Sequence, residues 1–193
     1  GDYSNFYKKL FPSGDIVYAK IINYDKLILN GFKTKLSGYE YEIDDIARVG
    51  DTIVVDGDGF GKDPIVIWEY GNHVRKIPIK NHSDTQIDFI VPNGVSHGFI
   101  RVFNGEMLSN PLEVRLVNND HPVIFPVDKD SMKVEPEKTF IVKGVNLRGG
   151  YGAVYGVFDQ ILSPAIFVND NEAKFKAPGN QFSFLFRIKN NSG

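Results

Sequence analysis

The sequence predicts an all-β protein built from two tandem β-sandwiches, with an extra β segment at the N-terminus. The chain has 193 residues, of which 42% are hydrophobic and 13% aromatic. Isoleucine, valine, phenylalanine and tyrosine dominate that apolar content, and such side chains suit a pleated surface better than a helix. Candidate strands are short and separated by turn residues, and one pattern recurs further along the chain.

Short apolar segments alternate with turn residues through the first part of the chain. The candidate strands are Asp15–Ile22, Lys26–Lys33, Thr52–Asp56, Ile65–Trp68, Gln86–Val91, Gly98–Phe103 and Leu112–Val117. The turn residues are Asn30-Gly31, Asp56-Gly57-Asp58-Gly59, Pro92-Asn93-Gly94 and Asn104-Gly105. Strands of this length and spacing are typical of a sandwich or barrel. The one candidate helix covers residues 1–10 and would end before Pro12.

An internal repeat divides the chain. The segment Gly50–Gly61 recurs in outline as Glu137–Leu147 at an offset of 87 residues, and Thr85–Gly94 recurs as Asn171–Asn180 at an offset of 86. The aligned pairs are Thr52 with Thr139, Val54 with Ile141, Gly57 with Gly144, Phe89 with Phe175 and Pro92 with Pro178. Two separate matches at nearly one offset indicate a duplicated domain.

The repeat sets the expected domain boundaries. Residues 46–118 form the first sandwich and residues 119–193 form a second, divergent one, with a short polar linker at Asn118–Pro122. Residues 1–45 belong to neither copy. Three alternatives stay open for them: an incomplete third domain, a hairpin added to the first sandwich, or an arm exchanged with a neighbour.

Composition excludes several classes of function. A net charge of −2 and a pI near 6.1 argue against nucleic-acid binding, which needs a dense basic patch. The chain has no cysteine, so disulfides, cysteine-ligated zinc and a cysteine nucleophile are excluded together. No apolar run approaches 18 residues, so we expect no membrane insertion by this segment. We expect an extracellular protein whose export signal or anchor is not part of this chain.

The first repeat resembles the IPT/TIG domain, an immunoglobulin-like fold of plexins and other surface receptors, bacterial adhesion proteins and some transcription factors. The likeness rests on Gly50-Asp51-Thr52, Gly57–Gly61, Phe89–Pro92 with Gly94, and Gly98–Val102 running into Ser109-Asn110-Pro111. The second copy departs from it at Arg148, lacks a counterpart of Gly98, and has no Ser-Asn after its last strand. The resemblance implies a fold and carries no catalytic residues.

No metal or cofactor is predicted. The loop from Asp56 to Gly61 begins like a calcium-binding EF-hand loop, but Phe60 and Ile67 stand where an oxygen ligand and the bidentate carboxylate belong. Asp128 and Asp130 offer a weaker cation site near the domain junction, although paired acids are usually just solvated. The four histidines lie singly, without the spacing that brings two imidazoles to one metal.

Candidate binding residues lie around the strand Ile65–Tyr70, which is apolar on both faces. Ile65 and Ile67 share one face, whereas Val66, Trp68 and Tyr70 share the other. One face must line the core. The other is either covered by the N-terminal segment or a neighbouring domain, or exposed as an aromatic platform. If an interaction surface exists, we expect Trp68, Tyr70, Asn72 and His73 to form it.

The sequence thus favours a non-enzymatic extracellular surface module, acting as a spacer or as a binding domain for carbohydrate or protein. Two alternatives remain. The chain could be a structural protein of a virion, such as a phage tail or capsid decoration. It could also be an accessory β domain of a polysaccharide-degrading enzyme, whose chemistry would then lie in another domain. The oligomeric state and the ligand's identity stay open.

Overall fold

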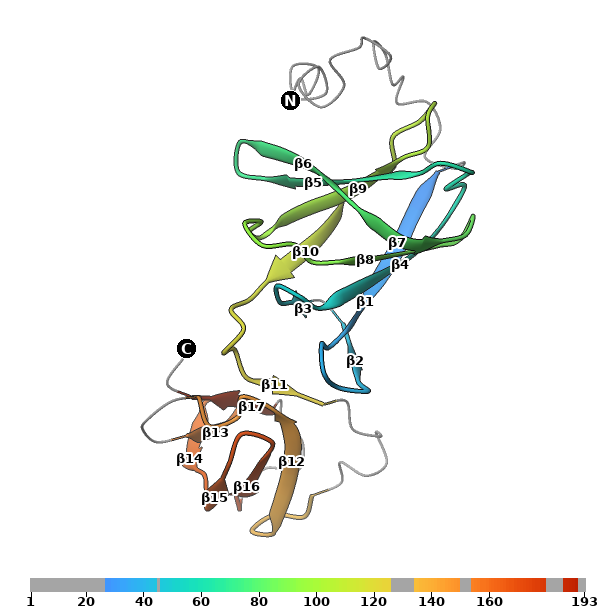
Figure 1. Cartoon of the computed structure of the whole chain (residues 1–193). Coiled ribbons are helices and arrows are strands. Elements are labelled where there is room, and N and C mark those ends of the chain that lie inside the picture. The colour runs from blue at the N-terminus through green and yellow to red at the C-terminus, as the bar shows by residue number, and fades with distance from the viewer. Residues whose placement is uncertain (1–26, 45, 126–133, 150–153, 180–185, 191–193) are drawn as a thin grey trace. The chain divides into compact units, whose positions relative to one another are not determined.

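The computed structural model of the chain describes residues 27–44, 46–125, 134–149, 154–179 and 186–190 (Figure 1). These residues fall into two compact units, one up to Val117 and one from Asn118 onward. Every regular element in these ranges is a β-strand, and each unit contains two sheets. The predicted class, an all-β protein of immunoglobulin-like sandwiches, is confirmed. Three expectations fall outside the described residues. They are the helix at residues 1–10, the strand at Asp15–Ile22, and the cation site at Asp128 and Asp130.

The first unit packs two five-stranded sheets face to face. One has the order β2 (Glu42–Ile43), β1 (Ile28–Lys35), β4 (Thr52–Asp58), β8 (Gln86–Ile90), β7 (Ile79–His82). The other has the order β3 (Ile46–Ala47), β10 (Leu112–Leu116), β9 (Gly98–Phe103), β5 (Ile65–Tyr70), β6 (His73–Ile77). Neighbouring strands are antiparallel except β3, which runs parallel to β10. This is the strand arrangement of an immunoglobulin-like sandwich.

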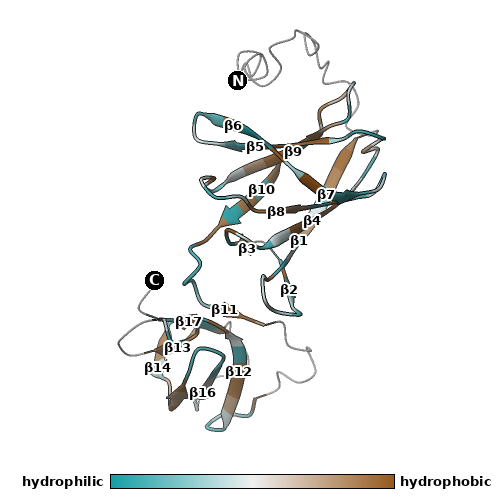
Figure 2. Ribbon diagram, in the orientation of Figure 1, coloured by the Kyte–Doolittle hydropathy of each residue, from teal (hydrophilic) through white to brown (hydrophobic). Residues whose placement is uncertain are grey.

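Two features of the first unit extend what the repeat predicted. Residues 28–35 and 42–43, which the repeat assigned to neither copy, form β1 and β2 and pair within the first sheet. Strands β6 and β7 lie on either side of Pro78 and are missing from the expected strands. Their sequences are mostly polar because both are edge strands, and Figure 2 shows hydrophilic colours along much of β6.

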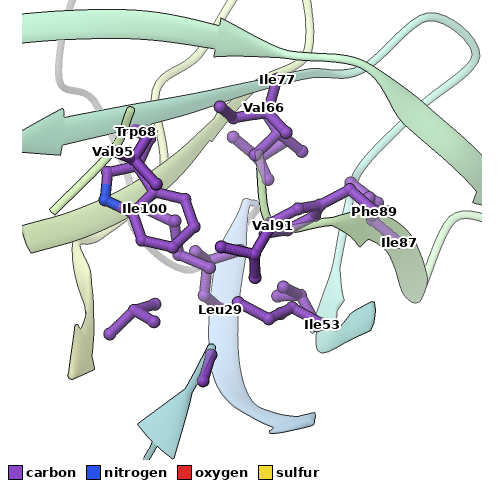
Figure 3. Packing of buried hydrophobic residues seen from close by; sticks show 14 of the residues in the cluster. Leu29, Ile53, Val66, Trp68, Ile77, Ile87, Phe89, Val91, Val95 and Ile100 are labelled. Atoms are coloured by element: carbon purple, nitrogen blue, oxygen red, sulfur yellow. The ribbon is translucent and has the colours of Figure 1, made fainter. Parts of the chain in front are cut away.

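The core of the first unit is built from alternate residues of both sheets. Trp68 and Phe89 are completely buried and meet edge to face, with ring centroids 6.3 Å apart. Figure 3 shows the indole of Trp68 beside Val95 and Ile100, with Phe89 and Val91 further along the same core. Aromatic and β-branched side chains fill the space between the sheets, as the composition predicted.

The second unit has fewer strands. One sheet has the order β11 (Val123–Ile124), β12 (Thr139–Val145), β16 (Glu172–Lys176), β15 (Phe167–Val168). The other has the order β14 (Ile161–Pro164), β13 (Tyr155–Phe158), β17 (Phe186–Lys189). Its core centres on four phenylalanine rings, at Phe140, Phe158, Phe175 and Phe186, in which Phe140 and Phe186 each contact the other three.

Equivalent backbone hydrogen bonds appear in the two units. The amide of Gly57 donates to the carbonyl oxygen of Thr85 at 2.9 Å, and that of Gly144 donates to the carbonyl oxygen of Asn171 at 3.0 Å. The amides of Phe60 and Leu147 likewise donate to Asp84 and Asp170, both at 3.1 Å. The repeat seen in the sequence therefore reflects two copies of one turn architecture.

Candidate functional site

The structure corrects the expected accessibility of Trp68. The face of β5 that holds Val66 and Trp68 lines the core, so the indole is completely buried. Its Nε1 donates a hydrogen bond to the carbonyl oxygen of Ser96 at 3.0 Å, which satisfies the one polar atom of the ring. Ile67, on the opposite face, is also completely buried. The prediction of an exposed aromatic platform that includes Trp68 was therefore wrong.

Tyr70, Asn72 and His73 do lie together, at the tip of the β5–β6 hairpin. Asn72 and His73 are exposed, and Tyr70 is half-buried against the core. The rings of Tyr70 and His73 are cross-strand partners with centroids 5.4 Å apart. Gly71 has a φ of 51°, which suits the first position of a two-residue hairpin loop. A binding role for this tip stays a prediction.

A groove of about 670 Å³ lies between β1 and β10, at one edge of the first sandwich. It is lined by Asn30, Gly31, Phe32, Asp44, His97, Leu112, Glu113 and Arg115. Among the described residues, β2 pairs only with Thr34 and Lys35 of β1, and β3 pairs only with Arg115 and Leu116 of β10. The groove therefore opens where, within the described ranges, neither sheet carries a further strand.

The side chain of Asn110, just before β10, forms two hydrogen bonds with the backbone of Leu29 in β1. The Leu29 amide donates to Oδ1 of Asn110 at 2.8 Å, and Nδ2 of Asn110 donates to the Leu29 carbonyl oxygen at 3.0 Å. The register of β1 against β4 shifts between Leu29 and Gly31, as in a β-bulge. No atom lies within 4 Å of where a Cβ on Gly31 would be, so the bulge leaves open space.

Polar side chains rim the groove above an apolar floor. His97 Nε2 and Glu113 Oε1 are 3.1 Å apart, and these two side chains are 53% and 61% exposed. Asp44, Arg115 and Asn30 add a carboxylate, a guanidinium and an amide, all exposed. Phe32 and Leu112 are half-buried and pack against the core. The groove thus offers hydrogen-bond donors and acceptors, including positively and negatively charged side chains, next to apolar surface.

Sequence reasoning missed this groove because its residues come from four separate segments. His97 and Glu113 meet only because the ends of β9 and β10 pair. The available signal was Asn30-Gly31, a turn-type dipeptide inside a predicted strand, which suggests a bulge or a close approach.

The loop from Asp56 to Gly61 is held by protein groups. Oδ1 of Asp56 accepts a hydrogen bond from Nε2 of Gln86 at 2.9 Å, and the Gly61 amide donates to Oδ1 of Asp84 at 2.8 Å. Gly59 and Gly61 have φ values of 76° and 73°, which favour glycine. Within the described residues, no group of three or more His, Asp or Glu side chains is placed to hold a metal.

Comparison with known proteins shows no matching family model and no matching curated protein. Similar solved structures include the gamma-CGTase from alkalophilic Bacillus clarkii, with 17% identity, a TM-score of 0.38, and coverage of 87% of this chain and 24% of that one. The Bacteroides ovatus SGBP-B of a mixed-linkage glucan utilization locus has 14% identity, a TM-score of 0.38, and coverage of 83% and 40%. The plexin A4 extracellular region has 14% identity, a TM-score of 0.35, and coverage of 80% and 12%.

The chain spans less than half the length of each of these structures. In the described part of the chain, no helix is long and apolar enough to cross a membrane.

Proposed function

We propose that the protein is a non-enzymatic extracellular surface module of the IPT/TIG type, and that its first sandwich binds carbohydrate in the groove between β1 and β10. The observation that carries this proposal is the set of polar side chains around the apolar floor of the groove. The His97 and Glu113 side chains lie 3.1 Å apart and are both more than half exposed, so one ligand in the groove can contact both groups.

The mixture of charges favours a neutral, hydroxyl-rich ligand. Asp44 and Glu113 bring negative charge, whereas Arg115 brings positive charge. A sugar hydroxyl both donates and accepts, so it can bond to carboxylate, amide, imidazole and guanidinium groups alike. Phe32 and Leu112 provide apolar surface for the C–H face of a sugar ring. The open form of the groove suits the inner units of a longer chain.

Titration calorimetry with a panel of neutral oligosaccharides tests the proposal. Single His97→Ala and Glu113→Ala variants should bind the best oligosaccharide roughly tenfold more weakly, because each loses a hydrogen bond to the sugar. Glu106→Ala is the matched control, since Glu106 is exposed in the turn before β10 and does not line the groove. Absence of any glycan binding, or equal affinity in all three variants, contradicts the proposal.

The hairpin tip of Tyr70, Asn72 and His73 is a second proposed contact, supported by the contact between the exposed ring of His73 and the half-buried ring of Tyr70. If Tyr70→Ala loses oligosaccharide binding while Glu113→Ala retains it, the binding site is at this tip and not in the groove. A mass measurement in solution addresses the virion alternative, because a closed ring or trimer favours assembly over a surface module.

A further inference from the structure

The outer face of the sheet formed by β11, β12, β16 and β15 carries two exposed apolar side chains on either side of a lysine. Ile141 on β12 pairs with Lys174 on β16, and Lys174 pairs in turn with Phe167 on β15. Ile141 is 53% exposed and Phe167 is 50% exposed. Their chain neighbours Val142 and Val168 pack in the core, so these three cross-strand partners point outward. We call the three residues the Lys174 row.

The first unit has a different set of side chains in the corresponding row. Val54, Asp88 and Asn81 are cross-strand partners there, and they precede the members of the Lys174 row by 86 or 87 residues. Val54 is 6% exposed, and Oδ2 of Asp88 accepts a hydrogen bond from Nδ2 of Asn81 at 3.3 Å. The second copy replaces this buried and hydrogen-bonded row with exposed apolar side chains around a lysine.

Lys174 has no acid opposite it in the described part of this face. Glu172 lies opposite Lys143 in register, and Glu137 forms an ion pair with Lys176. Lys174 itself is half-buried between two apolar side chains. A carboxylate placed against it there would be partly shielded from water, and shielding strengthens the attraction between opposite charges. The row is therefore complementary to an acidic group that has apolar groups on both sides.

The charge of the row argues against a second copy of this chain as the occupant. A twofold dimer places the same patch of both subunits face to face. The two Lys174 ammonium groups would then lie close together and repel each other. A sugar is also a poor match, because Ile141 and Phe167 offer its hydroxyl groups no hydrogen bond.

The spacing of the row fits one face of an α-helix. Neighbouring strands lie about 4.8 Å apart, so the three positions span about 10 Å across the sheet. On a helix, residues three or four apart have Cβ atoms about 5–6 Å apart. A helix that crosses the strands can therefore place side chains i, i+4 and i+7 on Phe167, Lys174 and Ile141.

We propose that the Lys174 row binds an amphipathic helix of a partner protein, with an aspartate or glutamate on Lys174 and apolar side chains on Ile141 and Phe167. The apolar contacts remove two exposed side chains from water, and the carboxylate selects the partner and its register. This surface lies in the second unit and uses no residue of the carbohydrate groove, so the proposal is independent of sugar binding.

A displayed library of alanine-rich helical peptides, randomised at positions i, i+4 and i+7, tests the proposal against the full chain. We expect enrichment of peptides with apolar residues at the two outer positions and aspartate or glutamate at the middle one. Selection against the Lys174→Glu variant should instead enrich lysine or arginine at the middle position. Lys80→Glu is the matched control, since Lys80 is exposed on β7 of the first unit, and it should select the same acidic peptides as the wild type.

Fluorescence anisotropy with the best acidic peptide measures what each member of the row contributes. Phe167→Ala and Lys174→Glu should each weaken binding at least roughly tenfold, because one removes an aromatic contact and the other makes an attraction repulsive. Lys80→Glu should leave the affinity unchanged. Circular dichroism checks that each variant is folded.

Three results overturn the proposal. The first is a library that yields no enriched pattern with the wild-type chain. The second is selection of the same middle residue by the wild type and by Lys174→Glu, because Lys174 then does not read the carboxylate. The third is tighter binding of an oligogalacturonate than of the best peptide, lost in Lys174→Glu, because the occupant is then an anionic glycan.

Discussion

The side-chain amide of Asn190 donates a hydrogen bond to the carbonyl oxygen of Asn146 at 2.9 Å. Asn104 makes the equivalent bond to Gly59 in the first unit, also at 2.9 Å. Gly59 and Asn146 both have positive φ, at 76° and 54°. In each unit, an asparagine just after a later strand therefore forms a hydrogen bond with the turn that follows the second core strand. The two asparagines, Asn104 and Asn190, are 86 residues apart, close to the offset of the internal repeat.

Replacing Asn190 should destabilise the second unit. The residue is 4% exposed, so Asn190→Ala removes a buried bond and leaves the Asn146 carbonyl without that donor. We expect a loss of about 1–3 kcal/mol in the free energy of unfolding, measured by urea denaturation. Asn118→Ala, at an exposed position, is the control and should change stability by less than about 0.5 kcal/mol. Equal midpoints for the two variants would show that the bond is not needed.

Trp68 should report the core of the first unit, because it is the only tryptophan in the chain and is completely buried. We expect blue emission that acrylamide quenches poorly, shifting red on unfolding. Trp68→Ala should cost about 3–5 kcal/mol through the cavity it leaves. Red, readily quenched emission from the folded protein would contradict this placement.

The ion pair of Arg48 and Asp51 should contribute far more than a surface pair. Asp51 is 1% exposed, and its carboxylate accepts hydrogen bonds from the amides of Ser37 and Arg48 and from the Arg48 guanidinium. Asp51→Ala leaves a buried cation unpaired, so we expect a loss of about 3–5 kcal/mol. Glu42→Gln, which removes the exposed contact with Lys35 at 3.7 Å, should cost less than about 1 kcal/mol. Similar losses in both variants would refute the distinction.

Substitution of either of two equivalent glycines, Gly57 and Gly144, should destabilise its unit. A Cβ on Gly57 would clash with the carbonyl oxygen of Ile28, and a Cβ on Gly144 would clash with that of Val123. Gly57→Ala and Gly144→Ala should each lower the thermal midpoint by an amount equivalent to more than about 2 kcal/mol, because backbone must move. Gly31→Ala has open space and is the control. A wild-type midpoint in either variant would mean that the neighbouring strand moves aside easily.

The pattern of residues was enough to predict the strands that carry strong apolar alternation and the turns between them. Gly98–Phe103 has the predicted bounds, and Thr52 and Gln86 begin their strands as expected. These features are local, since alternation and turn glycines depend on neighbours in the chain. The internal repeat was equally visible, because duplicated turns need the same residues at the same spacing.

The sequence by itself determined that β5 has two apolar faces, and it predicted a duplicated domain, whose turn hydrogen bonds recur in both units. Only the tertiary structure decided that Trp68 faces inward, because either face of such a strand can line a core until its partner sheet is known. It also decided the groove at His97 and Glu113, since that groove depends on which strands lie side by side. Strand neighbours are set by long-range pairing between segments, and the alternation within one segment does not encode them.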